Sequence, residues 1–416
     1  TFKEGGTNFT NSLLVGTDGT GTLSSATGNT GVGTSVLAAL TSGDRNTAIG
    51  IESMNDITTG ADNVAVGNNS LDETTTGTNN TAVGGYSLSE NTTASGNTAV
   101  GNVSLYCNTT GANNVAVGFC SLRANTTASD NVAVGRNAML GTTTGASNLA
   151  VGTSAMQSNT TGASNTAVGG NSTMFANTTG SNNVAVGLSA LQSNTTAAEN
   201  VAIGKQALQG NTTGASNTAV GTQSLYTNTT GANNVAMGLG ALFANTTADK
   251  NTAVGVSALT ANTTADENTA VGMNSLCANT TGNLNTAVGA DSLRVNVDGF
   301  NNTAVGYAAL QNNTNGSCNT AVGLEALGSN TTGTVSTAVG LGALSGQTTG
   351  DNNTAVGMRA LRVSTTGKFN VAMGNEALTA NTTACNNTAI GWRAGCSITT
   401  GARNVAIGAV SLDNNT

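Results

Sequence analysis

The chain has 416 residues, with 12 Lys and Arg, 20 Asp and Glu, 56 Gly, no Pro and no His, and a net charge of −8. The absence of His excludes a Ser-His-Asp triad, an imidazole base and an ordinary zinc site. The acidic balance argues against a nucleic-acid partner. No apolar run approaches the roughly 20 residues of a membrane-spanning helix, so we expect no membrane insertion.

In chain order, residues 1–28 carry only a degenerate copy of the repeat that fills the rest of the chain, and we expect them to form a cap or junction. From Asn46 onward the pentapeptide Asn-Thr/Val-Ala-Val/Ile-Gly, or a close variant, occurs 22 times. Every step is 17 residues except one of 18, in the coil 165–182, where we interpret Thr173 as the insertion. With a looser copy at Asn29, residues 29–416 are predicted to form one continuous repeat.

We number the repeat positions 1–17 from this Asn. Position 4 is always Val, Ile or Met, position 5 is always Gly, and position 9 is Leu or Met except at Gly395. From Arg45 onward the charged residues occupy positions 6, 7, 10, 11, 16 and 17, with Asp298 at position 14 as the one exception. Such a frame is expected when the same face of every coil is buried.

A 17-residue repeat is too short for a helix-turn-helix unit. The pentapeptide alternates and is β-branched at positions 2 and 4, which predicts a short strand. Positions 6 to 9 are predicted to form a second strand that points the position-9 Leu inward. Positions 12 to 15 are predicted to form a turn, because Asn and Gly tolerate left-handed conformations. The fold class is therefore all-β, a β-solenoid of about 23 coils in which each coil contacts only its neighbours. The lack of Pro agrees with this fold class, because nearly every strand needs its backbone N–H groups for the hydrogen-bond ladder.

Position 3 is Ala in all 22 copies. If positions 2 and 4 point into the coil, position 3 points out, and a uniform small residue there suggests close packing against another chain. We therefore predict a parallel homotrimer with an interface that includes Ala82, Ala99, Ala253 and Ala270. The alternative is a monomeric solenoid in which Ala fits a crowded corner.

Position 12 begins an Asn-Thr-Thr acceptor sequence for N-glycosylation. Such a column of acceptors would comprise Asn91, Asn108, Asn125, Asn194, Asn211, Asn228, Asn245 and Asn262. The alternative is a hydrogen-bonded Asn ladder, which suits stacked identical turns. The Thr residues at positions 13 and 14 are similar to the Thr arrays of ice-binding solenoids, although such arrays need a flat, exposed sheet.

No catalytic, cofactor-binding or metal-ligating residues are predicted. The six Cys occupy positions 7, 10, 11, 16 and 17 without a CxxC spacing, which argues against a metal site. Asp266 and Glu267 are interpreted as solvated charges. Receptor contacts are expected from the variable positions 6, 7, 10 and 11, but the aromatic residues there are too dispersed to define a sugar site.

The pentapeptides Asn200–Gly204, Asn387–Gly391 and Asn404–Gly408 resemble the head repeats of trimeric autotransporter adhesins, which are usually shorter. That resemblance implies a homotrimeric left-handed β-roll outside the cell. The longer form that begins at Asn302 also resembles repeats in the tail fibres of aquatic phages. Both imply a structural fibre, extracellular, on a cell surface or virion, that projects a tip toward a glycan or protein receptor. The alternatives are a glycan-decorated environmental filament or an ice-binding solenoid.

Overall fold

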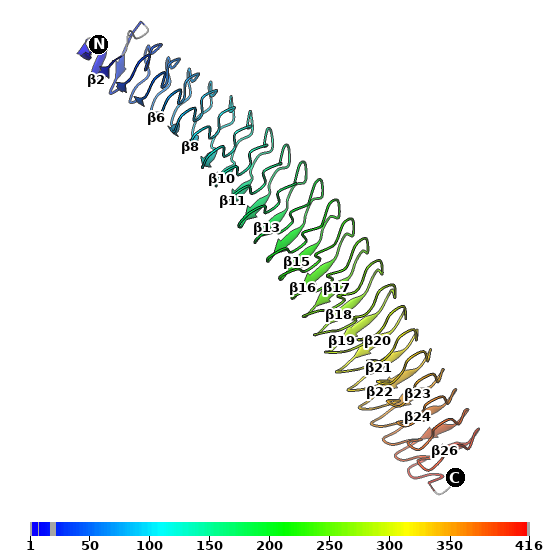
Figure 1. The fold of residues 1–416 in the computed structure, drawn as a ribbon. Coiled ribbons are helices and arrows are strands. Elements are labelled where there is room, and N and C mark those ends of the chain that lie inside the picture. Colours follow the sequence, from blue (N-terminus) through cyan, green and yellow to red (C-terminus); the bar gives the residue numbers. More distant parts are fainter. Residues whose placement is uncertain (1, 7, 17–21, 414–416) are drawn as a thin grey trace. The chain divides into compact units, whose positions relative to one another are not determined.

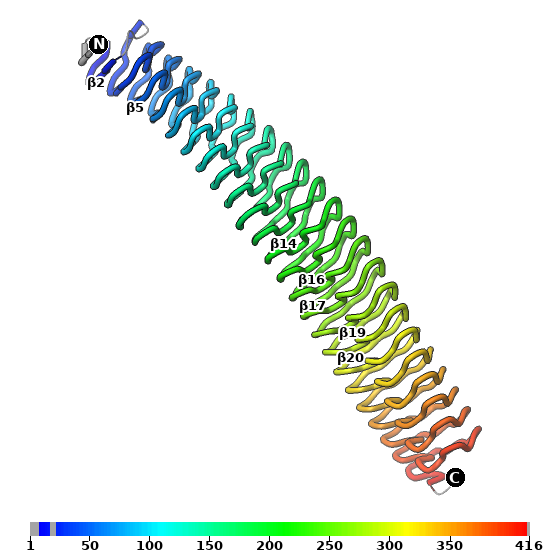
Figure 2. The backbone as a smooth tube through the Cα atoms, in the orientation of Figure 1, coloured from blue at the N-terminus to red at the C-terminus, as the bar shows by residue number. Residues whose placement is uncertain are grey.

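The computed structural model describes residues 2–6, 8–16 and 22–413. It is an all-β parallel β-solenoid of about 23 coils with a repeat of about 17 residues, as predicted, and the described residues contain no helix. The chain divides into unit 1, Thr1–Thr213, and unit 2, Gly214–Thr416. Within each unit one short strand per coil lies beside the strand of the next coil (Figure 1), and the backbone repeats the same path (Figure 2).

The strands of unit 1 are β1 (Phe2–Gly6), β2 (Phe9–Val15), β3 (Ala26–Thr27), β4 (Thr30–Val32), β5 (Thr47–Ile49), β6 (Val64–Val66), β7 (Thr81–Val83), β8 (Thr98–Val100), β9 (Val115–Val117), β10 (Val132–Val134), β11 (Leu149–Val151), β12 (Thr166–Val168), β13 (Val184–Val186) and β14 (Val201–Ile203). Those of unit 2 are β15 (Thr218–Val220), β16 (Val235–Met237), β17 (Thr252–Val254), β18 (Thr269–Val271), β19 (Thr286–Val288), β20 (Thr303–Val305), β21 (Thr320–Val322), β22 (Thr337–Val339), β23 (Thr354–Val356), β24 (Val371–Met373), β25 (Thr388–Ile390) and β26 (Val405–Ile407).

Neighbouring coils pair in parallel with a constant shift of one repeat. In β5 and β6, for example, Thr47 pairs with Val64 and Ala48 pairs with Ala65. The N–H of Thr47 donates to the next coil at Asn63 O (2.9 Å), whereas the N–H of Gly50 donates to the previous coil at Val32 O (2.9 Å). Because each strand bonds to both neighbours, a Pro within it would remove a ladder bond.

The segment 1–28, which we expected to be a cap or junction, differs from the coils. β1 pairs antiparallel with β2, and β2 then pairs in parallel with β3 and β4. Residues 1, 7 and 17–21 of this segment lie outside the described residues, as do residues 414–416 at the other end.

The second strand predicted for positions 6 to 9 is not formed. Positions 6 to 11 are turns in which positions 7 and 9 have left-handed backbone angles, as at Val103 (φ 58°) and Leu105 (φ 52°). Position 17 also has a left-handed backbone angle, as at Asn113 (φ 58°). The Leu at position 9 does point inward, as predicted, and Leu105 is fully buried.

The outward orientation predicted for position 3 is wrong. Ala82, Ala99, Ala253 and Ala270 are all 0% exposed within the single chain, because they face the interior of their own coils. At Gly31, the position-3 residue of the coil that begins at Asn29, an added Cβ would lie 2.5 Å from Leu14 Cδ2. The interior beside the strand is therefore crowded, and the larger side chains at positions 2 and 4 face outward.

Position 5 is Gly because neighbouring coils approach too closely for a side chain. Gly101 has φ 137°, and a Cβ there would lie 2.5 Å from Gly118 O in the next coil. Both the backbone angle and the contact exclude larger residues.

The 18-residue coil is confirmed, since Asn183 bonds to Asn165 across 18 residues. Thr173, however, is not the insertion. It accepts the N–H of Met156 at its carbonyl (3.0 Å), as position 8 does in other coils, and it is fully buried. The extra residue is accommodated between Gly169 and Ser172, where the backbone departs from the turn that the other coils repeat.

Candidate functional site

The Asn residues at position 12 form a buried hydrogen-bonded column. Asn108 Nδ2 donates to Asn91 Oδ1 in the previous coil (3.1 Å) and to Gly111 O in its own coil (2.9 Å). Asn125 continues the column by donating to Asn108 Oδ1 (2.7 Å). The ladder alternative is thus what the structure contains.

This burial overturns the predicted glycosylation column. Every member is 0% exposed, and each amide nitrogen takes part in the ladder or bonds to a carbonyl of its own coil, so none can carry a glycan in the folded chain. The residues concerned are Asn91, Asn108, Asn125, Asn194, Asn211, Asn228, Asn245 and Asn262.

A second column at position 1 was not predicted. The N–H of Asn63 donates to Asn46 Oδ1 (3.1 Å), and Asn63 Nδ2 donates to the position-15 carbonyl of Gly77 (2.9 Å). The two columns meet at that carbonyl, since Gly111 O accepts from Asn97 Nδ2 and also from Asn108 Nδ2, both at 2.9 Å. Its sequence signal was the near-invariance of the Asn at position 1.

One coil shows how the two columns depend on each other. It carries Ser336 at position 1 and Gln347 at position 12. The longer Gln347 reaches Ser336 Oγ (3.2 Å) and Asn330 Oδ1 (3.2 Å), and its Oε1 accepts from Asn353 Nδ2 (2.9 Å). The added methylene of Gln347 therefore extends its amide far enough to reach the shorter side chain of Ser336.

The two Thr rows at positions 13 and 14 face different surroundings. The position-13 hydroxyls bond to the next coil, as Thr92 Oγ1 does to Thr109 O (3.1 Å) and Thr109 Oγ1 to Thr126 O (3.0 Å). Position 14, as at Thr110, is exposed. Only one of the two rows is turned to solvent, and neither lies in a strand.

The outward face of the strand, positions 2 and 4, carries uncharged side chains from coil to coil. Where position 4 is exposed in the inner coils, the exposed fractions run from 36% at Val100 to 43% at Met237. Val and Thr exchange at position 2 without a fixed pattern. Here a largely β-branched column is presented to the outside of each unit, which is the reverse of the predicted arrangement.

Two aromatic pairs come from stacking across coils. Tyr226 and Phe243 both occupy position 10 in consecutive coils, and their rings stack with centroids 5.0 Å apart and an interplanar angle of 11°. Tyr86 and Tyr106 approach with centroids 6.4 Å apart. The first pair could have been found from the sequence by comparing the same position in successive coils.

Opposite charges pair in the same way. Arg45 and Asp62, both at position 17, form a bidentate contact (2.6 and 2.7 Å). Lys368 and Asp351, both at position 16, lie 2.6 Å apart. Burial acts to raise the pKa of Asp351, but hydrogen bonds from Lys368 and Thr334 outweigh it and the pKa is lowered.

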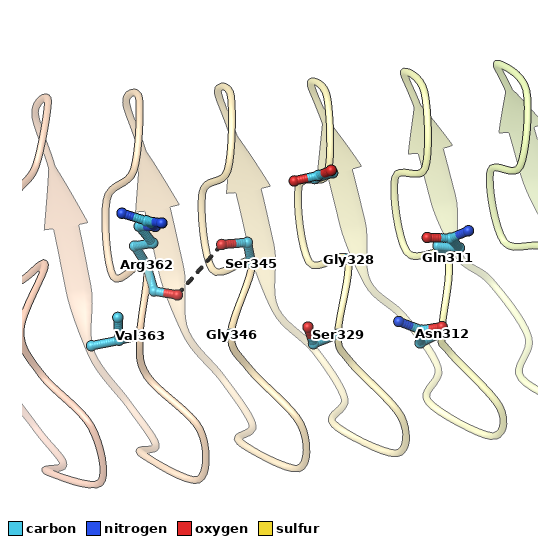
Figure 3. A pocket seen from close by; sticks show the side chains of 9 residues that line it. Gln311, Asn312, Gly328, Ser329, Ser345, Gly346, Arg362 and Val363 are labelled. Carbon is cyan, nitrogen blue, oxygen red and sulfur yellow. Dashed lines mark hydrogen bonds between the residues drawn. The ribbon is translucent and has the colours of Figure 1, made fainter.

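A shallow depression of about 460 Å³ lies on unit 2 where positions 10 and 11 carry small residues (Figure 3). Gly328, Ser329, Ser345 and Gly346 are among the residues that line it. Gln311 and Arg362 stand at its two ends, three coils apart, and Ser345 Oγ bonds to Arg362 O (3.5 Å). The lining is polar and open, and its functional groups do not converge on one point.

The cysteines and carboxylates form no recognisable metal centre in the described part of the chain. All six thiols are unpaired, and no group of three or more Cys, Asp, Glu or His side chains is arranged to hold a metal ion there. Nor do the described residues include a helix of the length and apolar character that crossing a bilayer requires.

No protein-family model matches the chain, and no curated protein matches its sequence.

Proposed function

We propose that this chain is a structural, non-catalytic part of an extracellular fibre, on a cell surface or a virion, that projects a receptor-binding tip. The observation that supports the proposal is that each coil bonds to its neighbours through the two Asn columns, the position-13 Thr row and the backbone ladder. In a quasi-one-dimensional array these contacts add from coil to coil, which suits a mechanical role.

Self-association into a parallel homotrimer is part of the proposal. Because the position-3 Ala residues are buried in their own coils, the contact between chains would involve the outward side chains at positions 2 and 4 instead. A glycan or protein receptor would be contacted through positions 6, 7, 10 and 11, wherever another copy of the chain leaves them open.

Electron microscopy of the purified full chain, combined with limited proteolysis, tests the mechanical role. We expect narrow, stiff particles and a chain that survives trypsin, since its cleavage sites from Arg45 onward lie within stacked coils. Compact globular particles, or rapid cleavage throughout the repeat, would contradict the proposal. An intact chain mass of 40.5 kDa would show that the chain carries no glycan.

A further inference from the structure

Unit 2 carries an apolar strip that has no counterpart in unit 1. It consists of positions 4 and 6 in the eight coils from Asn234 to Phe369. At position 6 the exposed fractions range from 40% at Met358 to 54% at Leu239, with the small Ala290 as the one interruption. No charged residue occupies positions 2, 4 or 6 in these coils.

In unit 1 position 6 is mixed. It includes Asn68, Asn102, Arg136 and Lys205, so the outward column at position 4 there has polar or charged neighbours. The column at position 4 is common to both units, and position 6 is what distinguishes them. Any property that depends on the strip therefore belongs to unit 2.

We infer that the strip is the surface through which copies of this chain contact one another, unit 2 against unit 2. This rests on the proposed fibre function and adds position 6 of unit 2 to the outward positions named there for the contact between chains. A second copy presents apolar groups at the spacing of the coils over the whole length of the strip, because it has the same repeat. The uncharged surface offers nothing to a partner recognised by its charge.

The area of the strip is sufficient for such a contact. Eight coils at about 4.8 Å per coil extend roughly 38 Å. Positions 2 and 4 lie about 6.7 Å apart along the strand, and position 6 follows in the turn beyond the Gly at position 5. The strip, together with the uncharged column at position 2 beside it, is therefore about 18 Å wide. Two such faces would bury roughly 1,400 Å² in total, within the range of stable protein interfaces.

The experiment compares two triple-lysine variants of the full chain by light scattering and sedimentation. The strip variant carries Met273→Lys, Leu324→Lys and Leu341→Lys. Its matched control carries Asn68→Lys, Asn102→Lys and Thr153→Lys at the same repeat position in unit 1. Lys205 and Arg136 show that position 6 accepts a long cation, so both variants should fold and keep the circular dichroism of the parent.

We expect the parent and the control to sediment as a multiple of 40.5 kDa, and the strip variant to dissociate with a Kd at least 100-fold higher. A strip variant that keeps its mass, or a control that dissociates equally, would overturn the inference. So would a parent that sediments as one chain, including one that binds lipid vesicles through the strip. If such a single chain is still a stiff rod in the microscope, the mechanical role stands, although the strip inference and the homotrimer have both failed.

Discussion

The position-12 column gives a direct test of what holds neighbouring coils together. Asn108→Ala removes one amide from the middle of the column while leaving the backbone ladder intact. Asn108 Nδ2 donates to Asn91 Oδ1 (3.1 Å) and Gly111 O (2.9 Å), and Asn108 Oδ1 accepts from Asn125 Nδ2 (2.7 Å). The substitution therefore breaks three buried hydrogen bonds at once.

The three lost hydrogen bonds differ in free-energy cost, because some of the former partners keep another hydrogen bond and one does not. Gly111 O keeps Asn97 Nδ2, and Asn125 Nδ2 keeps Ala128 O, so each of these bonds costs about 0.5–1.5 kcal/mol. Asn91 Oδ1 is left buried without its donor, at about 1–3 kcal/mol. The expected destabilisation is about 2–6 kcal/mol in total.

Native-state hydrogen exchange measured by mass spectrometry is the suitable assay, because coils contact only their neighbours and the effect should be local. Amides of the coils around Asn108 should exchange at least about 30-fold faster than in the parent. Peptides from unit 2 should not change. The control is Asn102→Ala in the same coil, which loses one exposed bond to Gly85 O (3.1 Å) and should change stability by no more than about 0.5 kcal/mol. If both variants exchange alike, the backbone ladder rather than the column holds the coils.

Three further predictions concern unit 2. Ser364→Asn should stabilise the local coils by about 1–3 kcal/mol, because Ser364 Oγ and both amide atoms of Asn381 are buried without partners, and slower exchange there would show it. Ser336→Asn and Gln347→Asn should each destabilise the chain while the double variant restores it, with a coupling of about 0.5–3 kcal/mol by denaturation. Asp351→Asn should lower stability at neutral pH but not in acid: the lowered pKa of Asp351 stabilises the fold above about pH 5, and this is lost as pH falls below about 4.

Each of these has a result that would contradict it. Unchanged exchange in Ser364→Asn would mean that the column does not continue through that coil. Additive effects at Ser336 and Gln347 would mean that the two columns are independent. A difference between parent and Asp351→Asn that persists at pH 2 would assign the effect to packing rather than to the carboxylate charge.

The period, the strand at positions 2 to 4 and the inward Leu at position 9 could be predicted because they follow from regular spacing alone. Which side of the strand faces the interior could not be predicted, since an alternating sequence fits either orientation. Hydrophobicity favoured Val inside and Ala outside. The interior beside the strand is so crowded that a Cβ at Gly31 would lie 2.5 Å from Leu14 Cδ2, which leaves room for a small residue only.

A better signal was nevertheless present. Position 2 exchanges Thr for Val from coil to coil, as between Thr98 and Val115, and a site that accepts a hydroxyl or a methyl equally is facing solvent. Position 3 never changes. Uniformity thus indicated crowding inside the coil rather than a contact outside it.

The turns at positions 6 to 11 could not have been predicted from residue preferences. Leu rarely takes a left-handed angle, yet Leu105 and its equivalents do so in nearly every coil. Their N–H groups bond to the next coil, as Leu105 N does to Ser121 O (2.9 Å), while position 7 bonds to the previous one, as Val103 N does to Gly85 O (3.0 Å). Stacking therefore outweighs a local cost of about 1–2 kcal/mol per residue.

Each residue of this sequence is consequently best understood as part of a column of residues at the same repeat position. Ser336 is an unusual residue at position 1 and Gln347 an unusual one at position 12, but together they keep both columns bonded. Arg45 and Asp62 likewise form an ion pair only because they occupy the same position in consecutive coils. The effect of a substitution should depend on which residues occupy the same position in the coils before and after it. The same substitution should therefore have different effects at an exposed Leu in unit 2 and at an exposed Asn at the same repeat position in unit 1.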